Sequence, residues 1–463
     1  MKASKYNIIL EEDDGGVLLF NCISCSFTRL NKENYDCYLK IISHDPCINV
    51  SDPKTKTLIE DLKVGCFIVD EFIDELSMLK FKHESIRFAK NHMTITILPT
   101  TACNFKCKYC FEGFQKHDYL SRELEDCIYK YVDDSLTKGG RLRVTWFGGE
   151  PGLAIDSVYR LSQKFFEMSL KKNIIFSSLC VTNGYSINRD VAAKLVKYGL
   201  NAMQITLDGP REVHNMRRPL KNGSGTYDTI INNLKDIAGI IPIYLRTNID
   251  KDNVDCFPRL LDELEENGLR ENVIINIGNT TADTDACYVY KNNIFNIHDY
   301  SEVIVGLYEL LVKRKFKIDA MIPSLHFVNC SSICSHGFFI YANGDIYKCV
   351  GFFGHESECI GNIRNSDKLN NNLAKWLAWD PFSNEYCRDC TIFPFCRGGC
   401  PSNWICPSEY LEFEDRCVHW KYTLPQLLRL QYQSLKENIF PNEGVKAGSI
   451  KTREENTNET VSI

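Results

Sequence analysis

The sequence has no excess of positive charge and no segment long and apolar enough to cross a membrane. Its 54 lysine and arginine residues are outnumbered by 60 aspartate and glutamate residues, which gives a formal net charge of −6. Such a chain has no global basic field to draw it to nucleic acid or anionic lipid. The most apolar run, around 303–312, contains Glu309 and is too short to span a bilayer. We therefore expect neither a nucleic-acid nor a membrane partner.

Targeting and nucleotide-binding signals are also missing. The chain turns acidic at Glu11–Asp14, where a signal peptide would need to stay apolar. Neither GxGxxG nor GxxxxGK[ST] occurs, so a nucleotide-phosphate loop of those types is unsupported, and no internal repeat is present. We expect a cytoplasmic protein, in which disulfides do not persist.

Cysteine, by contrast, is abundant. It makes up 22 of 463 residues, about 5 %, which is far above ordinary usage. Without disulfides, these residues are expected to be metal ligands, catalytic groups or buried packing residues. The hydrophobic share of 44 % and charged share of 25 % are those of a folded globular protein with room for several domains.

Strands and helices are predicted to alternate through the middle of the chain. The predicted strands are Thr94–Pro99, Arg143–Phe147, Ile174–Val181, Ala202–Leu207, Ile243–Asn248 and Val273–Ile277. Amphipathic helices are predicted near 121–136, 155–170, 189–198, 226–238, 256–266 and 301–315. Six β/α units in sequence predict an α/β fold with a parallel sheet, either doubly wound or curled as part of a barrel. Either arrangement gathers ligands at the carboxyl ends of the strands.

The two ends of the chain differ from this middle region. Alternating segments at 6–20 and 23–30, around the turn Asp13–Gly16, predict a β-hairpin. Helices near 33–42 and 55–64 and a strand at Cys66–Val69 complete a small α+β module of winged-helix size. After about residue 320 the periodicity breaks up and cysteines crowd in, and the polar end, Lys451–Ile463, is expected to fray.

The first cysteine group directly follows the first predicted strand of the β/α region. Cys103, Cys107 and Cys110 lie within eight residues and can wrap one face of an iron–sulfide cube. A [4Fe–4S] cluster normally takes four cysteines, so three ligands leave one iron open to hold a substrate or cofactor. The alternative is a zinc knuckle with His117 or Cys127 as fourth ligand, but zinc sites favour a CxxC pair plus a second, distant pair.

This CxxxCxxC pattern, with the aromatic Tyr109 before its third cysteine, resembles the radical S-adenosylmethionine (SAM) superfamily. The resemblance extends along the β/α region. The family's GGEP, TNG and [ST]LDG elements are matched by Gly148, Gly149, Glu150 and Pro151, by Thr182, Asn183 and Gly184, and by Thr206, Leu207, Asp208 and Gly209. The resemblance implies a partial (β/α)6 barrel over 91–322, SAM at the open iron, and the methionine amino group of SAM at the GGEP element.

Two further positions match the family. His214 and Arg218 stand at its spacing before a glycine-rich turn. Arg218 is expected to be the cationic partner of the SAM carboxylate, for which a guanidinium fork is well suited, with Arg217 as the fallback. Tyr109 is expected to pack near the adenine. Each element alone could be a turn, a strand end or solvated surface, but together they fall in order at successive strand ends.

The later cysteines resemble the SPASM pattern, Cx9–15Gx4C and then CxxCx5CxxxC with a last, separate cysteine. The resemblance implies two auxiliary [4Fe–4S] clusters, hence three clusters in all, within a domain at 323–430. The ligands of the first are Cys330, Cys334, Cys349 and Cys400, with Cys330 the least certain because some relatives leave one iron open to substrate. Those of the second are Cys387, Cys390, Cys396 and Cys417. Two structural zinc sites are the alternative, since CxxC pairs also bind zinc.

The other eleven cysteines have no spacing signal: Cys22, Cys25, Cys37, Cys47, Cys66, Cys127, Cys180, Cys256, Cys287, Cys359 and Cys406. Most are expected to be buried thiols that serve as small apolar side chains. Cys359 and Cys406 stay open as substrate-handling thiols because they lie near the auxiliary ligands in sequence.

The resemblance implies an enzyme that cleaves SAM reductively to a 5′-deoxyadenosyl radical, which abstracts hydrogen from an unactivated carbon. It also implies a low-potential electron donor such as ferredoxin or flavodoxin. Residues 1–90 resemble the winged-helix leader-recognition element of enzymes that modify ribosomally made peptides, which captures a peptide at a sheet edge. The alternative is a family-specific cap over the barrel. The C-terminal helix and tail are placed at 431–463.

We therefore expect a radical SAM/SPASM maturase of a precursor peptide, with thioether cross-linking as the leading reaction. Sulfatase-maturase-like side-chain oxidation, epimerisation and carbon–carbon cross-linking are alternatives. Sulfatase maturases carry an aspartate directly after the cysteine matched by Cys349, where this chain has Val350, which puts that reaction in doubt. The non-enzyme alternative is a multi-zinc binding module.

Overall fold

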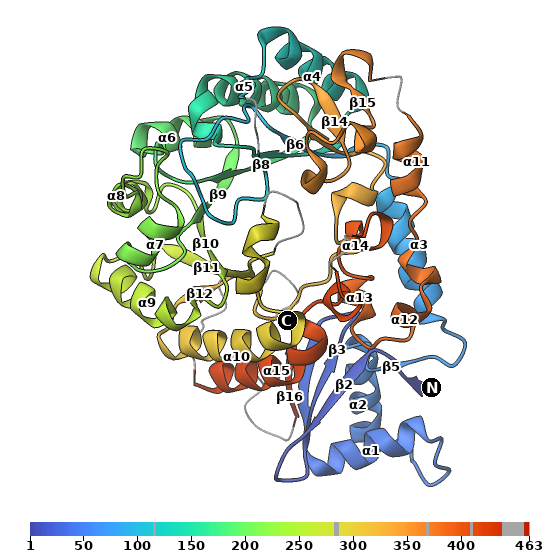
Figure 1. Ribbon diagram of the computed structural model, residues 1–463. Helices are drawn as coiled ribbons and strands as arrows, with labels where there is room; N and C mark the ends of the chain where they lie inside the picture. The colour runs from blue at the N-terminus through green and yellow to red at the C-terminus, as the bar shows by residue number, and fades with distance from the viewer. Residues whose placement is uncertain (114–116, 282–286, 367–369, 408–410, 438–457, 463) are drawn as a thin grey trace.

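A long, mostly parallel sheet organises the molecule (Figure 1). The computed structural model describes residues 1–113, 117–281, 287–366, 370–407, 411–437 and 458–462. Its central strands are β6 (His92–Ile97), β7 (Arg141–Trp146), β8 (Ile175–Thr182), β9 (Leu200–Thr206), β10 (Ile243–Ile249), β11 (Val273–Asn279) and β12 (Lys317–Ile318). Each pairs in parallel with the next. The α/β prediction and its six strands are confirmed.

Helices cover the outer side of this curved sheet. They are α4 (Arg122–Ser135), α5 (Ile155–Lys172), α6 (Arg189–Lys197), α7 (Arg211–Arg217), α8 (Tyr227–Ile237), α9 (Phe257–Glu266) and α10 (Ile297–Lys313). Figure 1 shows the strands in an arc with the helices outside it, which is the partial-barrel arrangement rather than the flat, doubly wound one.

Strand β10 shows why the sheet takes this form. Ile243, Leu245 and Ile249 are fully buried, while Arg246 and Asn248 between them are less buried. Alternate side chains of a strand point to opposite faces. The apolar set therefore packs under the outer helices, and the polar set faces the interior of the barrel.

The cysteine-rich region continues the same sheet. Strand β13 (Gly337–Ile340) pairs in parallel with β6, β14 (Asp345–Tyr347) pairs antiparallel with β13, and β15 (Gly361–Asn362) pairs antiparallel with β14. Short helices then lead to a long one: α11 (Asn371–Leu377), α12 (Glu385–Arg388), α13 (Phe393–Cys396), α14 (Ser402–Ile405) and α15 (Trp420–Lys436). Helix α15 packs along α10. Cys334 and Cys349, which stand just before β13 and just after β14, are thereby fixed to the edge of the barrel sheet.

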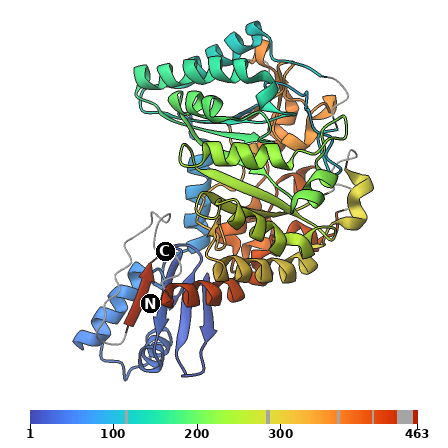
Figure 2. The same cartoon turned by 90° about the vertical axis from the view of Figure 1, so that its left-hand side faces the viewer.

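The N-terminal residues form a small separate sheet. Strands β2 (Asn7–Glu11), β3 (Val17–Asn21) and β4 (Ser26–Leu30) are antiparallel, and β16 (Asn458–Ser462) pairs antiparallel with β4 (Figure 2). Helices α1 (Lys32–Ile42) and α2 (Pro53–Val64) cover one face, and β5 (Ile68–Val69) pairs with β1 (Lys2–Ala3). The other face packs on the C-terminal region, where Phe20 and Phe27 meet Phe395 and Tyr432.

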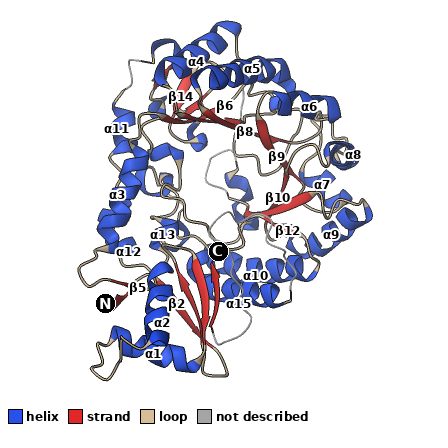
Figure 3. Cartoon of the chain, turned by 180° about the vertical axis from the view of Figure 1, so that it is seen from behind, coloured by secondary structure: helices blue, strands red, loops and turns tan. Residues whose placement is uncertain are grey.

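Helix α3 (Glu75–Arg87), which was not predicted, joins this module to the cysteine-rich region. The His83 ring lies 2.7 Å from the carbonyl oxygen of Phe327, and Arg87 donates to the carbonyls of Ile333 and Leu377 at 2.9 Å. Seen from behind, α3 runs beside α11 (Figure 3). The N-terminal sheet is therefore tied to the rest of the chain by a helix with polar anchors.

The described helices include none that is long and apolar enough to cross a bilayer. Of the tail predicted to fray, Lys451–Ile463, only 458–462 lies within the described residues, as β16. The C-terminal helix expected within 431–463 is α15, which begins earlier, at Trp420.

Candidate active site

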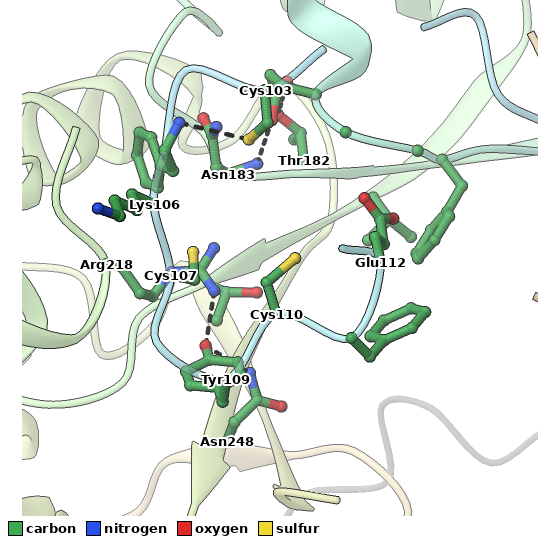
Figure 4. A pocket seen from close by; sticks show the side chains of 18 of the residues that line it. Cys103, Lys106, Cys107, Tyr109, Cys110, Glu112, Thr182, Asn183, Arg218 and Asn248 are labelled. Carbon is green, nitrogen blue, oxygen red and sulfur yellow. Dashed lines mark hydrogen bonds between the residues drawn. The ribbon is translucent and has the colours of Figure 1, made fainter. Parts of the chain in front are cut away.

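The loop after β6 carries the first cysteine group into a cavity of about 500 Å³. Figure 4 shows the side chains of Cys103, Cys107 and Cys110 around one common space. Backbone hydrogen bonds from Lys106 to Pro219 (2.8 Å) and from Lys108 to Arg217 (3.1 Å) tie this loop to the segment after α7. The loop is thus positioned by backbone contacts while its thiols stay available.

Cys103 and Cys107 are half-buried, and Cys110 is exposed. Burial raises the pKa of Cys103 to about 12 and that of Cys110 to about 11, and it also raises the pKa of Cys107. The charge of Glu112 adds to all three shifts, and that of Cys107 adds to the shifts of Cys103 and Cys110. Free thiols are disfavoured as anions here, whereas metal coordination deprotonates a thiol outright. Three thiols around one space fit a cluster with one open iron.

The Gly148–Gly149 pair lets the loop after β7 approach the cysteine loop closely. Gly148 has a φ of +116°, and a β-carbon at Gly149 would collide with the carbonyl oxygens of Thr101 and Ala102. In return, Gly149 N–H donates to Thr100 and Glu150 N–H donates to Ala102, at 3.1 and 2.9 Å. Only glycine permits this approach, which gives the GGEP element a structural reason.

Glu150 links this loop to the end of β8. Its carboxylate accepts hydrogen bonds from the Thr182 hydroxyl (2.6 Å), the Asn183 N–H (2.7 Å) and the Gly152 N–H (2.8 Å). Burial raises the pKa of Glu150, and the three hydrogen bonds lower it. Asn183 in turn donates to Asn104 on the cysteine loop at 2.8 Å. Elements from three strand ends therefore meet in one hydrogen-bonded frame.

The two adjacent arginines have different surroundings. Arg217 is buried and donates two hydrogen bonds to the Asp250 carboxylate, at 2.9 and 2.6 Å. Arg218 lines the cavity and donates to the Tyr109 hydroxyl at 2.7 Å. Among the described residues, no carboxylate lies within ion-pair distance of Arg218, whereas Arg217 has its own counter-ion. The arginine available to a ligand is Arg218.

Tyr109 belongs to a buried polar network. Its hydroxyl donates to the Asp208 carboxylate and accepts from Asn248 Nδ2 at 3.1 Å. His214 is fully buried and accepts from the Asp208 N–H at 3.2 Å, and burial lowers its pKa well below the ordinary value. A neutral His214 therefore holds the turn after β9 and does not face the cavity.

Most of the residues matched to SAM-binding elements line the cavity. They are Tyr109, Gly148, Gly149, Glu150, Thr182, Asn183, Thr206 and Arg218. Pro151 and Asp208 are buried and do not belong to the lining; Pro151 begins a short 3-10 turn, Pro151–Ala154. His117 lies at the cavity wall, whereas Cys127 is on α4 and packs against the core.

The structure gathers the cysteines assigned to the first auxiliary cluster. Burial raises the pKa of Cys349 to about 12, and the charges of Cys400 and Cys330 add to it. The pKa of Cys334 is raised to about 11 by burial, with a further contribution from Cys330. Thiols that act on one another in this way are close neighbours, although they come from separate segments.

The cysteines assigned to the second auxiliary cluster also affect one another's pKa values. The pKa of Cys387 is raised to about 11 by burial and then by Cys417 and Cys390. That of Cys396 is raised to about 12 by burial and then by Cys387, Cys417 and Cys390. Within the described ranges, no three His, Cys, Asp or Glu side chains are placed to hold a single metal ion.

The cysteines outside these groups have other surroundings. Four of the eleven are buried, six are half-buried and one, Cys47, is exposed, so the expectation that most are buried is wrong. The buried ones are Cys22, Cys25, Cys180 and Cys287, and the half-buried ones are Cys37, Cys66, Cys127, Cys256, Cys359 and Cys406. Cys359 Sγ lies 3.2 Å from the Gly361 carbonyl oxygen, and Cys406 Sγ lies 3.6 Å from Glu358 Oε2. Neither thiol lines the cavity.

Sequence reasoning missed several charged residues at the site. Arg246 and Glu112 line the cavity, and burial and Glu150 raise the pKa of Glu112 well above its ordinary value. Lys348 is buried beside the first auxiliary group and donates to the carbonyls of Cys334 and Gly337, both at 2.6 Å. In the sequence, the only indication that Lys348 belongs to the site is that it directly precedes Cys349.

Comparison with known proteins agrees with this geometry. Residues 97–264 match the family model of the radical SAM superfamily. A cysteine-type anaerobic sulfatase-maturating enzyme of Clostridium novyi is 25% identical over 340 residues, covering 67% of this chain and 88% of that protein.

Two solved structures share the fold. One is described as native anSMEcpe with bound AdoMet and Cp18Cys peptide, with a TM-score of 0.57, 19% identity, and coverage of 75% of this chain and 98% of that one. The other is Streptococcus suis SuiB bound to precursor peptide SuiA, with a TM-score of 0.52, 16% identity, and coverage of 90% and 98%. The family implies a [4Fe–4S] cluster and SAM as cofactors. The chain is thus an enzyme with a radical SAM domain at residues 97–264, and it is similar to maturases of that superfamily.

Proposed function

We propose that this enzyme modifies a ribosomally made precursor peptide and that its leading product is a thioether between a cysteine sulfur and a peptide carbon. The observation that carries the proposal is the cavity at the strand ends, which Cys103, Cys107 and Cys110 line together with Glu150 and Arg218. When bound there, a [4Fe–4S] cluster with SAM supplies a 5′-deoxyadenosyl radical that abstracts hydrogen from carbon.

The residues around the cavity bind and position SAM. We assign the SAM carboxylate to Arg218, whose guanidinium lacks a carboxylate partner among the described residues. We assign the methionine amino group to the loop of Gly148, Gly149 and Glu150. Tyr109 and Asn248 hold Arg218 and the end of β10 in fixed relation through the Tyr109 hydroxyl.

We propose that the two C-terminal cysteine groups hold two auxiliary clusters. Cys330, Cys334, Cys349 and Cys400 form the first set, and Cys387, Cys390, Cys396 and Cys417 the second. Lys348 lies against the first set, where burial lowers its pKa to about 7 and the charges of Cys334 and Cys330 act in the opposite direction. A low-potential ferredoxin or flavodoxin is the electron donor that we infer from the chemistry.

We place peptide capture at the edge of the N-terminal sheet, beside β4. What supports this is that the chain's own β16 pairs there as an antiparallel strand, with Ser26 opposite Ser462 and Leu30 opposite Asn458. An extended peptide would add by the same backbone hydrogen bonds. Ending the chain after residue 437 should therefore raise peptide affinity. Ile9→Pro, on the opposite edge strand β2, is the matched control.

Val350 favours cross-linking over sulfatase maturation. It follows Cys349 directly and begins a short 3-10 turn, Val350–Phe352, so no carboxylate stands at that position. The relative from Clostridium novyi shows that the barrel alone does not separate these reactions. The product analysis must therefore distinguish them.

The test is the mass and thiol content of the product. Reconstituted, reduced enzyme is incubated with SAM and candidate precursor peptides. A thioether lowers the peptide mass by two hydrogens and removes one alkylatable thiol, while a carbon–carbon cross-link keeps the thiol. Unchanged mass with deuterium gained from solvent indicates epimerisation. Colourless, zinc-rich protein without iron would contradict the enzyme proposal itself.

A further inference from the structure

A second arginine projects into the barrel below the level of the cysteine loop. Arg246 lies on β10 two residues before Asn248, on the same interior face, and both line the cavity. Two residues along a strand correspond to about 7 Å. Asn248, nearer the carboxyl end of β10, contacts Tyr109 of the cysteine loop. Arg246 precedes it on the strand and therefore lies deeper in the barrel than Asn248, Tyr109 and Arg218.

Neutral amides hold this guanidinium in place. Arg246 Nε donates to Asn248 Oδ1 at 3.0 Å, and Nη1 donates to Asn276 Oδ1 on β11 at 2.7 Å. Asn276 is itself fixed, because its amide donates to Asp319 at 2.5 Å. The orientation of Arg246 is therefore set by two neighbouring strands.

The backbone of β11 is shaped around the same group. A β-carbon at Gly278 would collide with Cζ and both terminal nitrogens of Arg246. The backbone of Gly278 is not in the left-handed region, so the glycine is needed here for space alone. Since Nε and Nη1 donate to Asn248 and Asn276, Nη2 is the guanidinium nitrogen without a hydrogen-bond partner among the described residues.

The charge of Arg246 is not neutralised by the described part of the chain. No carboxylate there lies within 4.0 Å of its nitrogens, in contrast to Arg217, which forks onto Asp250. A charge held away from bulk water is costly unless it is paired. A preorganised guanidinium that faces a cavity with Nη2 unengaged can bind a carboxylate through a charge-assisted hydrogen bond.

We propose that Arg246 binds a carboxylate of the peptide substrate and thereby sets which residue faces the radical. This inference rests on the proposed function, since it names the substrate group that the same cavity takes. The carboxylate is either the C-terminus of the peptide or an Asp or Glu side chain. Arg218 lies on the other side of Asn248 and Tyr109 and remains the partner of SAM.

Small probes test this site without turnover. N-acetyl-Gly-Gly presents a terminal carboxylate, N-acetyl-Glu amide presents a side-chain carboxylate, and N-acetyl-Gly-Gly amide presents neither. Each is titrated by calorimetry into anaerobic, SAM-saturated holoenzyme. We expect at least one carboxylate probe to bind about tenfold or more tightly than the neutral amide, as one charge-assisted hydrogen bond implies. The tighter of the two carboxylate probes identifies the source.

Variants assign the preference to Arg246. Arg246→Gln should reduce the tenfold preference to less than about twofold, and Arg246→Lys should keep part of it because the positive charge remains although the fixed orientation of the guanidinium is lost. Gly278→Ala keeps the arginine but displaces its guanidinium, so it should also weaken the preference. Arg189→Gln, on the exposed start of α6, is the matched control. Iron content and SAM affinity report on folding in every variant.

The outcomes separate this inference from the function on which it rests. Equal binding of all three probes to the wild-type enzyme would overturn the inference, as would a preference that survives in both Arg246→Gln and Gly278→Ala. So would loss of SAM affinity in Arg246→Gln with the preference intact, because Arg246 would then belong to SAM. If peptides are modified but the probes are not distinguished, only this inference fails. If the probes are distinguished but no peptide is modified, the carboxylate site stands and the proposed function fails.

Discussion

The guanidinium of Arg217 and the carboxylate of Asp250 form a buried, two-pronged ion pair, with Nη1–Oδ1 at 2.9 Å and Nη2–Oδ2 at 2.6 Å. The next residue, Arg218, has no such partner among the described residues and faces the cavity. Two adjacent arginines therefore have separate tasks, one in holding the fold and one in binding.

Substituting each arginine in turn should separate these tasks. Arg217→Gln leaves Asp250 buried without its partner and should cost about 3–5 kcal/mol of stability, measured by thermal unfolding. Arg218→Gln should instead lower SAM affinity about tenfold or more, because charge-assisted hydrogen bonds are worth about 1.5–3 kcal/mol. An Arg217→Gln protein of normal stability that fails to bind SAM would reverse the assignment.

Replacing Cys103, Cys107 and Cys110 together by alanine should remove one cluster. If the chain holds three [4Fe–4S] clusters, iron should fall from about twelve to about eight atoms per chain, and 5′-deoxyadenosine formation should stop. Cys47→Ala changes an exposed cysteine of the N-terminal module and is the matched control. Full iron content in the triple variant would show that the site is misassigned.

Lys348 should be needed for the first auxiliary group. Lys348→Met removes the donor to the carbonyls of Cys334 and Gly337, which are then left buried without it. We expect a loss of about four iron atoms per chain, measured by iron analysis and by the spectrum of the remaining clusters. Lys375→Met, which removes a more exposed ammonium paired with Glu358, is the control. Unchanged iron and spectra would contradict this role.

Acid should weaken the contact between α3 and the cysteine-rich region. Burial lowers the pKa of His83 from 6.5 to about 4. The folded state therefore binds fewer protons than the unfolded state between these values, so stability is full above pH 6.5 and falls as pH drops toward 4. At 1.36 kcal/mol per pKa unit, the loss is about 3 kcal/mol.

His83→Asn keeps a donor for the Phe327 carbonyl and removes the titration, so it should flatten this part of the pH dependence. Denaturant unfolding between pH 4 and 7 measures the effect. The same substitution at the exposed His92 controls for loss of an imidazole. If His83→Asn has the same dependence of stability on pH as the wild type, His83 is not the cause of the acid destabilisation.

The barrel could be predicted because its strands have a clear hydrophobic pattern in the sequence. In β10, buried apolar residues alternate with less buried ones from Ile243 to Ile249, and the same pattern recurs at regular spacing with helices between. The site loops were predicted from their resemblance to a family, and Gly148 and Gly149 show why such loops tolerate little change.

Helix α3 escaped prediction for a physical reason. The face it buries consists of Glu75, Leu79, His83 and Arg87, four residues apart and mostly polar. Phe81 on its other side is exposed. A search for apolar periodicity finds no helix in such a segment, because its buried face is stabilised by hydrogen bonds that form only with distant parts of the chain.

Arg246 and Lys348 were not predicted as site residues for a similar reason. Each is a single charged residue on or after a strand, which in sequence looks like a solvent-facing position. Their significance depends on Asn276 and Gly278 in one case and on the backbone of Cys334 and Gly337 in the other. Such contacts arise only when the strands are assembled.

The most direct measurement follows hydrogen from peptide to SAM. A precursor peptide deuterated at carbon is incubated with reduced enzyme and SAM, and 5′-deoxyadenosine is analysed by mass spectrometry. Our account predicts deuterium in the 5′-deoxyadenosine, in step with loss of deuterium from a cross-linked peptide. Modified peptide together with unlabelled 5′-deoxyadenosine would contradict it. So would SAM cleavage whose rate does not depend on the peptide and that leaves every peptide unmodified.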